Sequence, residues 1–254
     1  MKRYRYVRWL LAVVTALAFT SAVAEGPIQI TADEAFDAVA TQTDPLYEDV
    51  EAVVALVDVR SRAEYYWVGT AARVDEILLT GKKAPRSVVP DLGKVRLIHG
   101  GKFLEYKVKG RYQRVPVDKV AELKTSPIAL SIPYRLWDES QAKLVDNDAF
   151  GDAINDLADQ GVDILIVFCR SGGRSTECVV NLDPAILSRF QAVYEIDDPS
   201  GIIVGVGGFE GSAYGQAYNG YRGFPGRPTE GQDEPSVSWK DAALPIKTGV
   251  NPLQ

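Results

Sequence analysis

Short, wholly apolar runs alternate with amphipathic segments along most of this chain of 254 residues. Residues 164–168 are apolar at every position, as expected of a strand that is buried on both faces of a sheet. Residues 52–59 and 192–196 predict further strands, and amphipathic helical segments are interspersed with them. Such alternation predicts an α/β fold, an open parallel sheet with helices on both faces.

Polar residues mark where several helices begin. Thr31–Glu34 and Ser61–Glu64 both match the capping box, in which a hydroxyl and a glutamate three residues later satisfy the first free N–H groups of a helix. The first helix is expected to run to about residue 40, and the second to about residue 66. Asn147 or Asp148 is expected to cap a third helix, ending at Asp159.

Two segments interrupt this alternation within what is predicted to be a single domain over residues 25–254. Residues 75–127 form a β-rich insertion, with expected strands at 95–99, 102–108 and 111–115. Residues 205–238 form an extended loop that is rich in glycine and aromatic residues at its start. Both segments could alter the entrance to any site at the edge of the sheet.

Residues 1–24 have the composition of a secretory signal peptide. Lys2, Arg3, Arg5 and Arg8 precede an apolar stretch, and Ala22-Val23-Ala24 resembles a cleavage site. An uncleaved membrane anchor is the alternative, but the apolar stretch is short for a span. We therefore expect an exported, periplasmic protein without a stable membrane span. Cleavage would change the net charge from −6 to −10, which disfavours nucleic acid as a partner.

The chemistry-bearing residues gather in one loop, which begins directly after the apolar run at 164–168. Cys169 is expected to lie among backbone N–H groups at a helix N-terminus, with Arg170 and Arg174 beside it. This environment favours a reactive thiolate. Asp58-Val59-Arg60 ends another predicted strand, so it could face the same pocket.

The remaining cysteine and the single histidine have structural interpretations. Cys178 is expected on the helix that follows the loop, buried and too far from Cys169 for a disulfide. His99 lies in a predicted hairpin of the insertion, so a Cys-His protease is disfavoured. One histidine and two separated cysteines do not form a usual metal-ligand set, and no metal or cofactor is expected.

Taken together, these motifs resemble the single-domain rhodaneses. The resemblance rests on Asp58-Val59-Arg60, Glu64-Tyr65, the loop 169–175, Gly207-Gly208-Phe209 and the ending Trp239–Pro245. It implies that residues 239–243 form a short helix before the Leu-Pro pair. The family's usual Gly-His is replaced here by Gly69-Thr70, and the insertions leave the substrate open.

The resemblance implies a sulfurtransferase that carries sulfane sulfur on Cys169 as a persulfide. The donor would be a small anion such as thiosulfate, and the acceptor a thiol, cyanide or a protein. Asp58 and Arg60 would brace the active loop, with Asp58 accepting hydrogen bonds from loop amides. The loop residues expected to bind the donor and the persulfide are Arg170, Ser171, Gly172, Gly173, Arg174 and Ser175.

Two alternatives remain at this point. Cysteine phosphatases and arsenate reductases place an arginine six positions after the cysteine, whereas Ser175 occupies that position here and Arg174 precedes it. The shorter loop favours sulfur over phosphate. A sulfur-carrier or protein-docking module without turnover is the other alternative.

Overall fold

The computed structural model describes most of the chain between residues 26 and 251. The described residues are 26–80, 95–99, 102–108, 111–197, 199, 207–210, 238–240, 242 and 244–251. The predicted signal peptide and nearly all of the 205–238 loop lie outside these ranges, so those predictions stay predictions. No helix in the described ranges has the length and apolar character that a membrane span requires.

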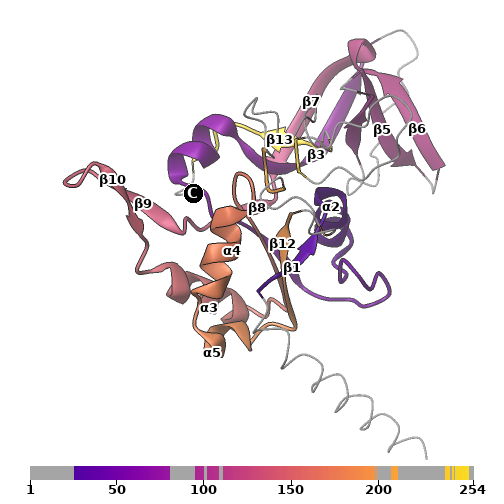
Figure 1. Ribbon diagram of the computed structural model, residues 1–254. Helices are drawn as coiled ribbons and strands as arrows, with labels where there is room; N and C mark the ends of the chain where they lie inside the picture. The colour runs from indigo at the N-terminus through magenta and orange to yellow at the C-terminus, as the bar shows by residue number, and fades with distance from the viewer. Residues whose placement is uncertain are drawn as a thin grey trace, which may run out of the picture.

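A five-stranded parallel sheet forms the centre of the fold, as Figure 1 shows. Its order is β1 (Ile28–Ile30), β12 (Ala192–Ile196), β11 (Ile164–Phe168), β2 (Val54–Asp58) and β8 (Ala129–Ser131). The predicted α/β class is therefore confirmed. The central strands β11 and β2 are buried at every position, which agrees with their apolar sequences.

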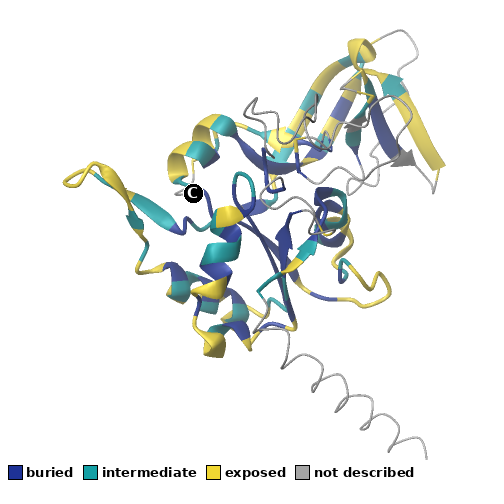
Figure 2. Ribbon diagram, in the orientation of Figure 1, coloured by how far each residue is buried: buried dark blue, intermediate teal, exposed yellow. Residues whose placement is uncertain are grey.

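Helices cover both faces of this sheet. Residues Ile164, Ile166 and Phe168 of β11 belong to the core under α2 (Ala32–Thr41). Leu165 and Val167 belong to the core on the opposite face. That face is covered by α3 (Phe150–Asp159), α4 (Gly173–Val180) and α5 (Pro184–Leu187), and Figure 2 shows the buried sheet between the two layers.

Both predicted capping boxes are confirmed, but the helices differ from expectation in detail. The Thr31 box opens α2. The Ser61–Glu64 box leads into a π-helical turn, η2 (Glu64–Val68). The predicted cap of α3 is wrong, because Ala149 is the N-cap and makes no side-chain capping bond. Asn147 instead accepts a bond from the N–H of Ala149, in a turn that precedes the helix.

The expected strands of the insertion are present. β4 (Arg96–Ile98), β5 (Phe103–Val108) and β6 (Arg111–Pro116) form an antiparallel sheet. A short 3₁₀ turn, η3 (Val117–Lys119), follows. β3 (Thr70–Leu79) pairs with β7 (Val120–Pro127), so the β-rich region begins five residues before the predicted boundary. It has a core of its own, built from Val74, Ile77, Val95, Leu104 and Tyr106.

A separate hairpin projects from the sheet before α3. It consists of β9 (Arg135–Asp138) and β10 (Lys143–Asp146), which pair in antiparallel register. Figure 1 shows it at the opposite side of the molecule from the β-rich insertion.

The C-terminal segment closes against the core on the α2 face. Residues 238–240 and 242 lie in turns, so the helix expected at 239–243 is not present among them. Trp239 is fully buried, and its indole N–H donates to the Pro245 carbonyl at 2.7 Å. This bond and the bond from the Leu244 N–H to the Trp239 carbonyl curl the chain tightly. β13 (Ile246–Lys247) then pairs with β3.

Candidate active site

The ends of β11 and β2 bring the predicted site residues to one edge of the sheet. Phe168 is the last residue of β11, and its carbonyl accepts a bond from the Val59 N–H at 3.0 Å. Cys169 therefore lies next to the Asp58–Arg60 segment, as expected for neighbouring parallel strands. The loop then enters α4 at Gly173, after the N-cap residue Gly172.

The thiol of Cys169 is held inside the loop. Its residue is 1% exposed, and its sulfur accepts a hydrogen bond from the Gly172 N–H at 3.3 Å. The Ser175 hydroxyl lies 3.6 Å from the same sulfur. The N–H groups of residues 170–174 were expected to surround the sulfur. Within the described loop, the Gly172 N–H is the one that bonds it. The N-terminus of α4 also favours negative charge there.

Glycines determine the shape of the loop and of the segment beneath it. Gly172 has φ +106°, and a Cβ there would lie 2.5 Å from Oδ2 of Asp197. Gly208 has φ +72°, and a Cβ there would lie 2.7 Å from the Cys169 carbonyl oxygen. A side chain at either position would strain the backbone and collide with its neighbour.

The segment 207–210 lies directly against the loop and braces it. The Phe209 N–H donates to the carbonyl of Cys169, and the Glu210 N–H donates to that of Arg170, both at 2.9 Å. The sequence identified the double glycine as a motif, but not this role.

Asp58 does not brace the loop in the way predicted. Among the described residues, its carboxylate accepts bonds from the Arg60 side chain at 2.6 and 2.8 Å, from the Arg60 N–H and from the Thr70 hydroxyl. The prediction of direct bonds from loop amides is therefore wrong. Asp58 and Arg60 are both fully buried, so each charge needs the other as its partner.

Arg60 connects this buried pair to the loop indirectly. Its guanidinium lies 4.0 Å from the centre of the Phe209 ring and 3.8 Å from Oε1 of Glu210. Glu210 in turn accepts a bond from Arg170 at 3.3 Å. Arg60 therefore supports the segment 207–210, and that segment supports the loop.

Both loop arginines are already paired with carboxylates. Arg174 donates two bonds to Glu64, at 2.7 and 2.9 Å, and Arg170 pairs with Glu210. Burial alone would raise the pKa of Glu64, but the hydrogen bond and charge of Arg174 lower it to about 2. The positive charge expected to attract an anion is thus largely compensated in this structure.

Two buried acids beneath the loop were missed by the sequence analysis. Glu195 is fully buried on β12, and its Oε1 lies 2.5 Å from the Ser175 hydroxyl. Burial, together with the nearby charge of Asp197, raises the pKa of Glu195 to about 7, although hydrogen bonds from Ser175 and Thr176 act in the opposite direction. The signal was a glutamate between Tyr194 and Ile196, inside an otherwise apolar strand. A charged residue at such a position usually has a specific partner.

Cys178 and His99 lie where the sequence placed them. Both cysteines are free, and Cys178 donates a weak bond from its sulfur to the Ser175 carbonyl. Burial raises the pKa of Cys178, which keeps it as an unreactive thiol. His99 occupies the turn after β4, with its ring against that of Phe103. Across the described ranges, no three His, Cys, Asp or Glu side chains gather as metal ligands do.

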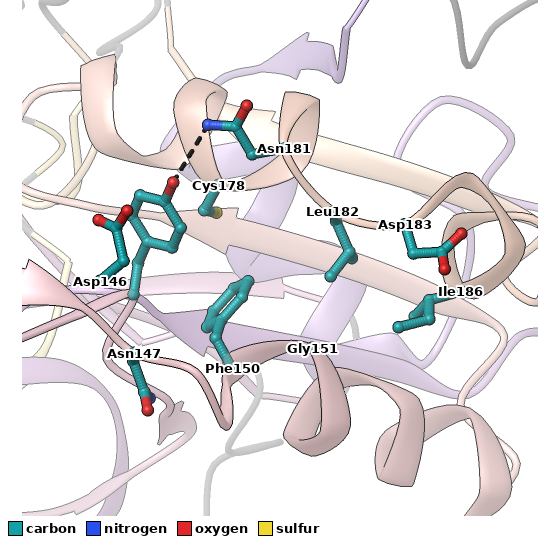
Figure 3. A pocket seen from close by; sticks show the side chains of 10 residues that line it. Asp146, Asn147, Phe150, Gly151, Cys178, Asn181, Leu182, Asp183 and Ile186 are labelled. Carbon is teal, nitrogen blue, oxygen red and sulfur yellow. Dashed lines mark hydrogen bonds between the residues drawn. The ribbon is translucent and has the colours of Figure 1, made fainter.

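A cleft of about 460 Å³ lies on the α3, α4 and α5 side of the molecule, as Figure 3 shows. Tyr134, Phe150, Cys178 and Asn181 are among its lining residues, and none of residues 169–175 is. The cleft is therefore separate from the thiol loop.

Comparisons of this chain with protein-family models, with curated proteins and with solved structures give no match. The functional argument therefore depends on the geometry of the site itself.

Proposed function

We propose that this protein is a sulfurtransferase of the rhodanese type, with Cys169 as the nucleophile that carries the transferred sulfur. The observation that carries the proposal is the placement of Cys169. It follows a central parallel strand, enters a helix N-terminus within four residues, and receives the Gly172 N–H on its sulfur. Such a position stabilises a sulfur anion.

The chemistry is a transfer in two displacement steps. The Cys169 thiolate attacks the outer sulfur of a donor such as thiosulfate. The donor's sulfur–sulfur bond breaks, and its electron pair leaves with sulfite. Cys169 then carries a persulfide, whose outer sulfur is attacked by a thiol or cyanide while the Cys169 thiolate departs. Covalent catalysis of this kind divides one difficult transfer into two easier ones.

The pairing of Arg174 supports sulfur transfer over phosphate chemistry. A phosphate cradle needs a guanidinium directed at the oxyanion, usually as a fork of two hydrogen bonds. Arg174 already directs both of its bonds at Glu64. The loop contact present on the sulfur comes from a backbone N–H, which suits a small sulfane sulfur anion.

Further assignments accompany this proposal. The parallel sheet would be a rhodanese-like fold, with residues 205–238 as an extension of the domain. Residues 1–24 would direct export to the periplasm and be cleaved there. No cofactor is needed, because both displacement steps use the thiol alone.

A sulfur carrier without turnover is a second candidate, supported by the burial of Cys169. A persulfide on a residue that is 1% exposed would be shielded from acceptors in free solution. A carrier would therefore load sulfur and release it only to a docked protein.

Mass analysis of the purified chain after thiosulfate treatment tests these functions. We expect one added sulfur atom in the wild type and in Cys178→Ser, and none in Cys169→Ser. Cyanide should then release the sulfur as thiocyanate with repeated turnover. Loading without turnover would indicate the carrier. Absence of loading would refute the sulfur-transfer proposal, and hydrolysis of an aryl phosphate would favour a phosphatase.

A further inference from the structure

Three buried groups form a short row from the thiol into the sheet. The Cys169 sulfur lies 3.6 Å from the Ser175 hydroxyl, which lies 2.5 Å from Oε1 of Glu195. Ser175 and Glu195 are fully buried, and Cys169 is 1% exposed. Water therefore has little access to this row, and the proton positions are set by the three groups themselves.

The hydroxyl of Ser175 has one proton and three neighbouring acceptors. Besides Cys169 and Glu195, the Gly172 carbonyl lies 2.5 Å away. The Thr176 hydroxyl also bonds both oxygens of Glu195, at 2.9 and 3.0 Å. Hydrogen bonds to a charged group are roughly twice as strong as neutral ones, so the Ser175 proton follows the charge.

Two arrangements of protons fit these positions without moving a heavy atom. When Glu195 is ionised, Ser175 donates to its carboxylate and can accept the proton of the Cys169 thiol. When Glu195 is protonated, its O–H donates to Ser175, and Ser175 donates to the Cys169 thiolate. The two arrangements differ by one proton moved at each end of the serine hydroxyl.

We propose that Glu195 receives the proton of the Cys169 thiol through Ser175, and so acts as the positioning residue that makes the nucleophile available. The S–H bond of Cys169 breaks as its proton passes to Ser175 Oγ, and the former Ser175 proton forms the O–H bond of Glu195. Thiol plus carboxylate becomes thiolate plus carboxylic acid, with no other reactant. This inference rests on the proposed function only in taking Cys169 as the nucleophile.

The base required by this step is otherwise absent from the described site. The single histidine, His99, belongs to the β-rich insertion. Glu195 is a stronger base than an ordinary carboxylate, because burial raises its pKa to about 7. It can therefore hold the thiol proton near neutral pH.

The neighbours of Glu195 in the sheet carry no positive charge that would oppose protonation of its carboxylate. Its in-register neighbours are Gln29 on β1 and Val167 on β11, and neither titrates. Asp197, which directly follows β12, adds negative charge, and this charge favours uptake of a proton by Glu195. No ion pair among the described residues includes Glu195.

The ionisable groups of α4 do not compete with Glu195 for the thiol proton. Cys178 remains a thiol because burial raises its pKa. Arg174 pairs with Glu64, and Glu177 pairs with Arg135.

The test follows alkylation of Cys169 by iodoacetamide against pH, read by mass spectrometry on the full chain without a sulfur donor. In the wild type we expect the rate to rise in two steps, because two coupled groups share one proton. In Glu195→Gln we expect one step. At pH 7 the alkylation rate of Glu195→Gln should fall about tenfold or more below that of the wild type, because the thiol has lost the group that accepts its proton. A rate at or above that of the wild type would overturn the inference.

Ser175→Ala separates a relay from a mere through-space charge effect. We expect the Glu195→Gln change to be mostly lost in the Ser175→Ala background. A single step in the wild type, or an equal Glu195→Gln effect with and without Ser175, would overturn the inference.

Infrared titration of the carboxyl band follows the protonation of Glu195 directly. This measurement does not require Glu195→Gln to fold. In Cys169→Ser the two-step titration of Glu195 should become a single step. An unchanged two-step titration there would overturn the inference.

Failure of the inference is distinguishable from failure of the proposed function. Two-step titration in a chain that takes no sulfur from thiosulfate would keep the proton relay and remove the sulfurtransferase. Sulfur transfer with a single-step titration would do the reverse.

Discussion

Replacing Glu195 by glutamine should remove a pH-dependent cost from the stability of the fold. Burial raises the pKa of Glu195 from its ordinary value of 4.5 to about 7 in the folded chain. The folded state therefore holds a proton that the unfolded state has released between these pH values. Stability must fall as the pH rises through this window, because folding then requires a buried carboxylate or an extra proton.

The size of this effect follows from the shift in pKa. Each unit corresponds to about 1.4 kcal/mol, so a shift from 4.5 to about 7 gives a limit of roughly 3 kcal/mol. Between pH 5 and pH 8 the wild type should lose about 2.5 kcal/mol of stability through Glu195. The Gln variant has no such group to titrate, so it should gain that amount relative to the wild type.

Urea denaturation at pH 5 and pH 8 measures the difference directly. With a slope of about 2.5 kcal/mol per molar urea, the midpoint of Glu195→Gln should move by roughly 1 M relative to the wild type. Glu139→Gln is the matched control, because Glu139 is exposed and its loss should move both midpoints equally. A Glu195→Gln difference that is the same at both pH values would refute the reasoning.

Three further substitutions test the packing around the loop. Gly208→Ala should cost about 2–3 kcal/mol and disturb the loop, since its Cβ would meet the Cys169 carbonyl; Gly161→Ala, also at positive φ but in open space, should cost only about 1 kcal/mol. Equal melting shifts for the two would contradict this account. Cys178→Ala should leave sulfur loading unchanged and cost about 1–2 kcal/mol, and a large loss of loading would reveal a second functional thiol. Trp239→Ala should cost about 3–5 kcal/mol by urea denaturation, because a fully buried indole and its hydrogen bond are lost; a cost below about 1 kcal/mol would show that the C-terminal segment does not close the core.

Local sequence patterns identified the elements of this protein well. The strands at 164–168 and 192–196 lie at their predicted positions, and both capping boxes form. These features depend on hydrogen bonds and on patterns of buried side chains among residues that are only a few positions apart in the sequence. The same information is present in the order of apolar and polar positions. The predicted start of α3 was wrong because Asn147 forms a turn before the helix, and the sequence pattern of that turn resembles the pattern of a helix cap.

The loop at 169–175 was also recognised from the sequence, because its glycines, thiol and following helix are contiguous. The side-chain contacts of the residues beside the loop were not predicted correctly. Asp58 was assigned to the loop amides, although the geometry of the buried edge gives it to Arg60 and Thr70. The Arg60 and Thr70 side chains together take the hydrogen bonds that the loop amides were expected to donate, and only the packed structure decides which donors are within reach of Asp58.

The sequence alone therefore determined the parallel α/β architecture and the position of the thiol, through interactions between residues that are close along the chain. The tertiary structure alone decided which charges face that thiol. Glu64 lies 110 residues from Arg174, and Glu195 lies 20 residues from Ser175. Side chains so far apart meet only through the order and register of the sheet, and no local pattern specifies those contacts.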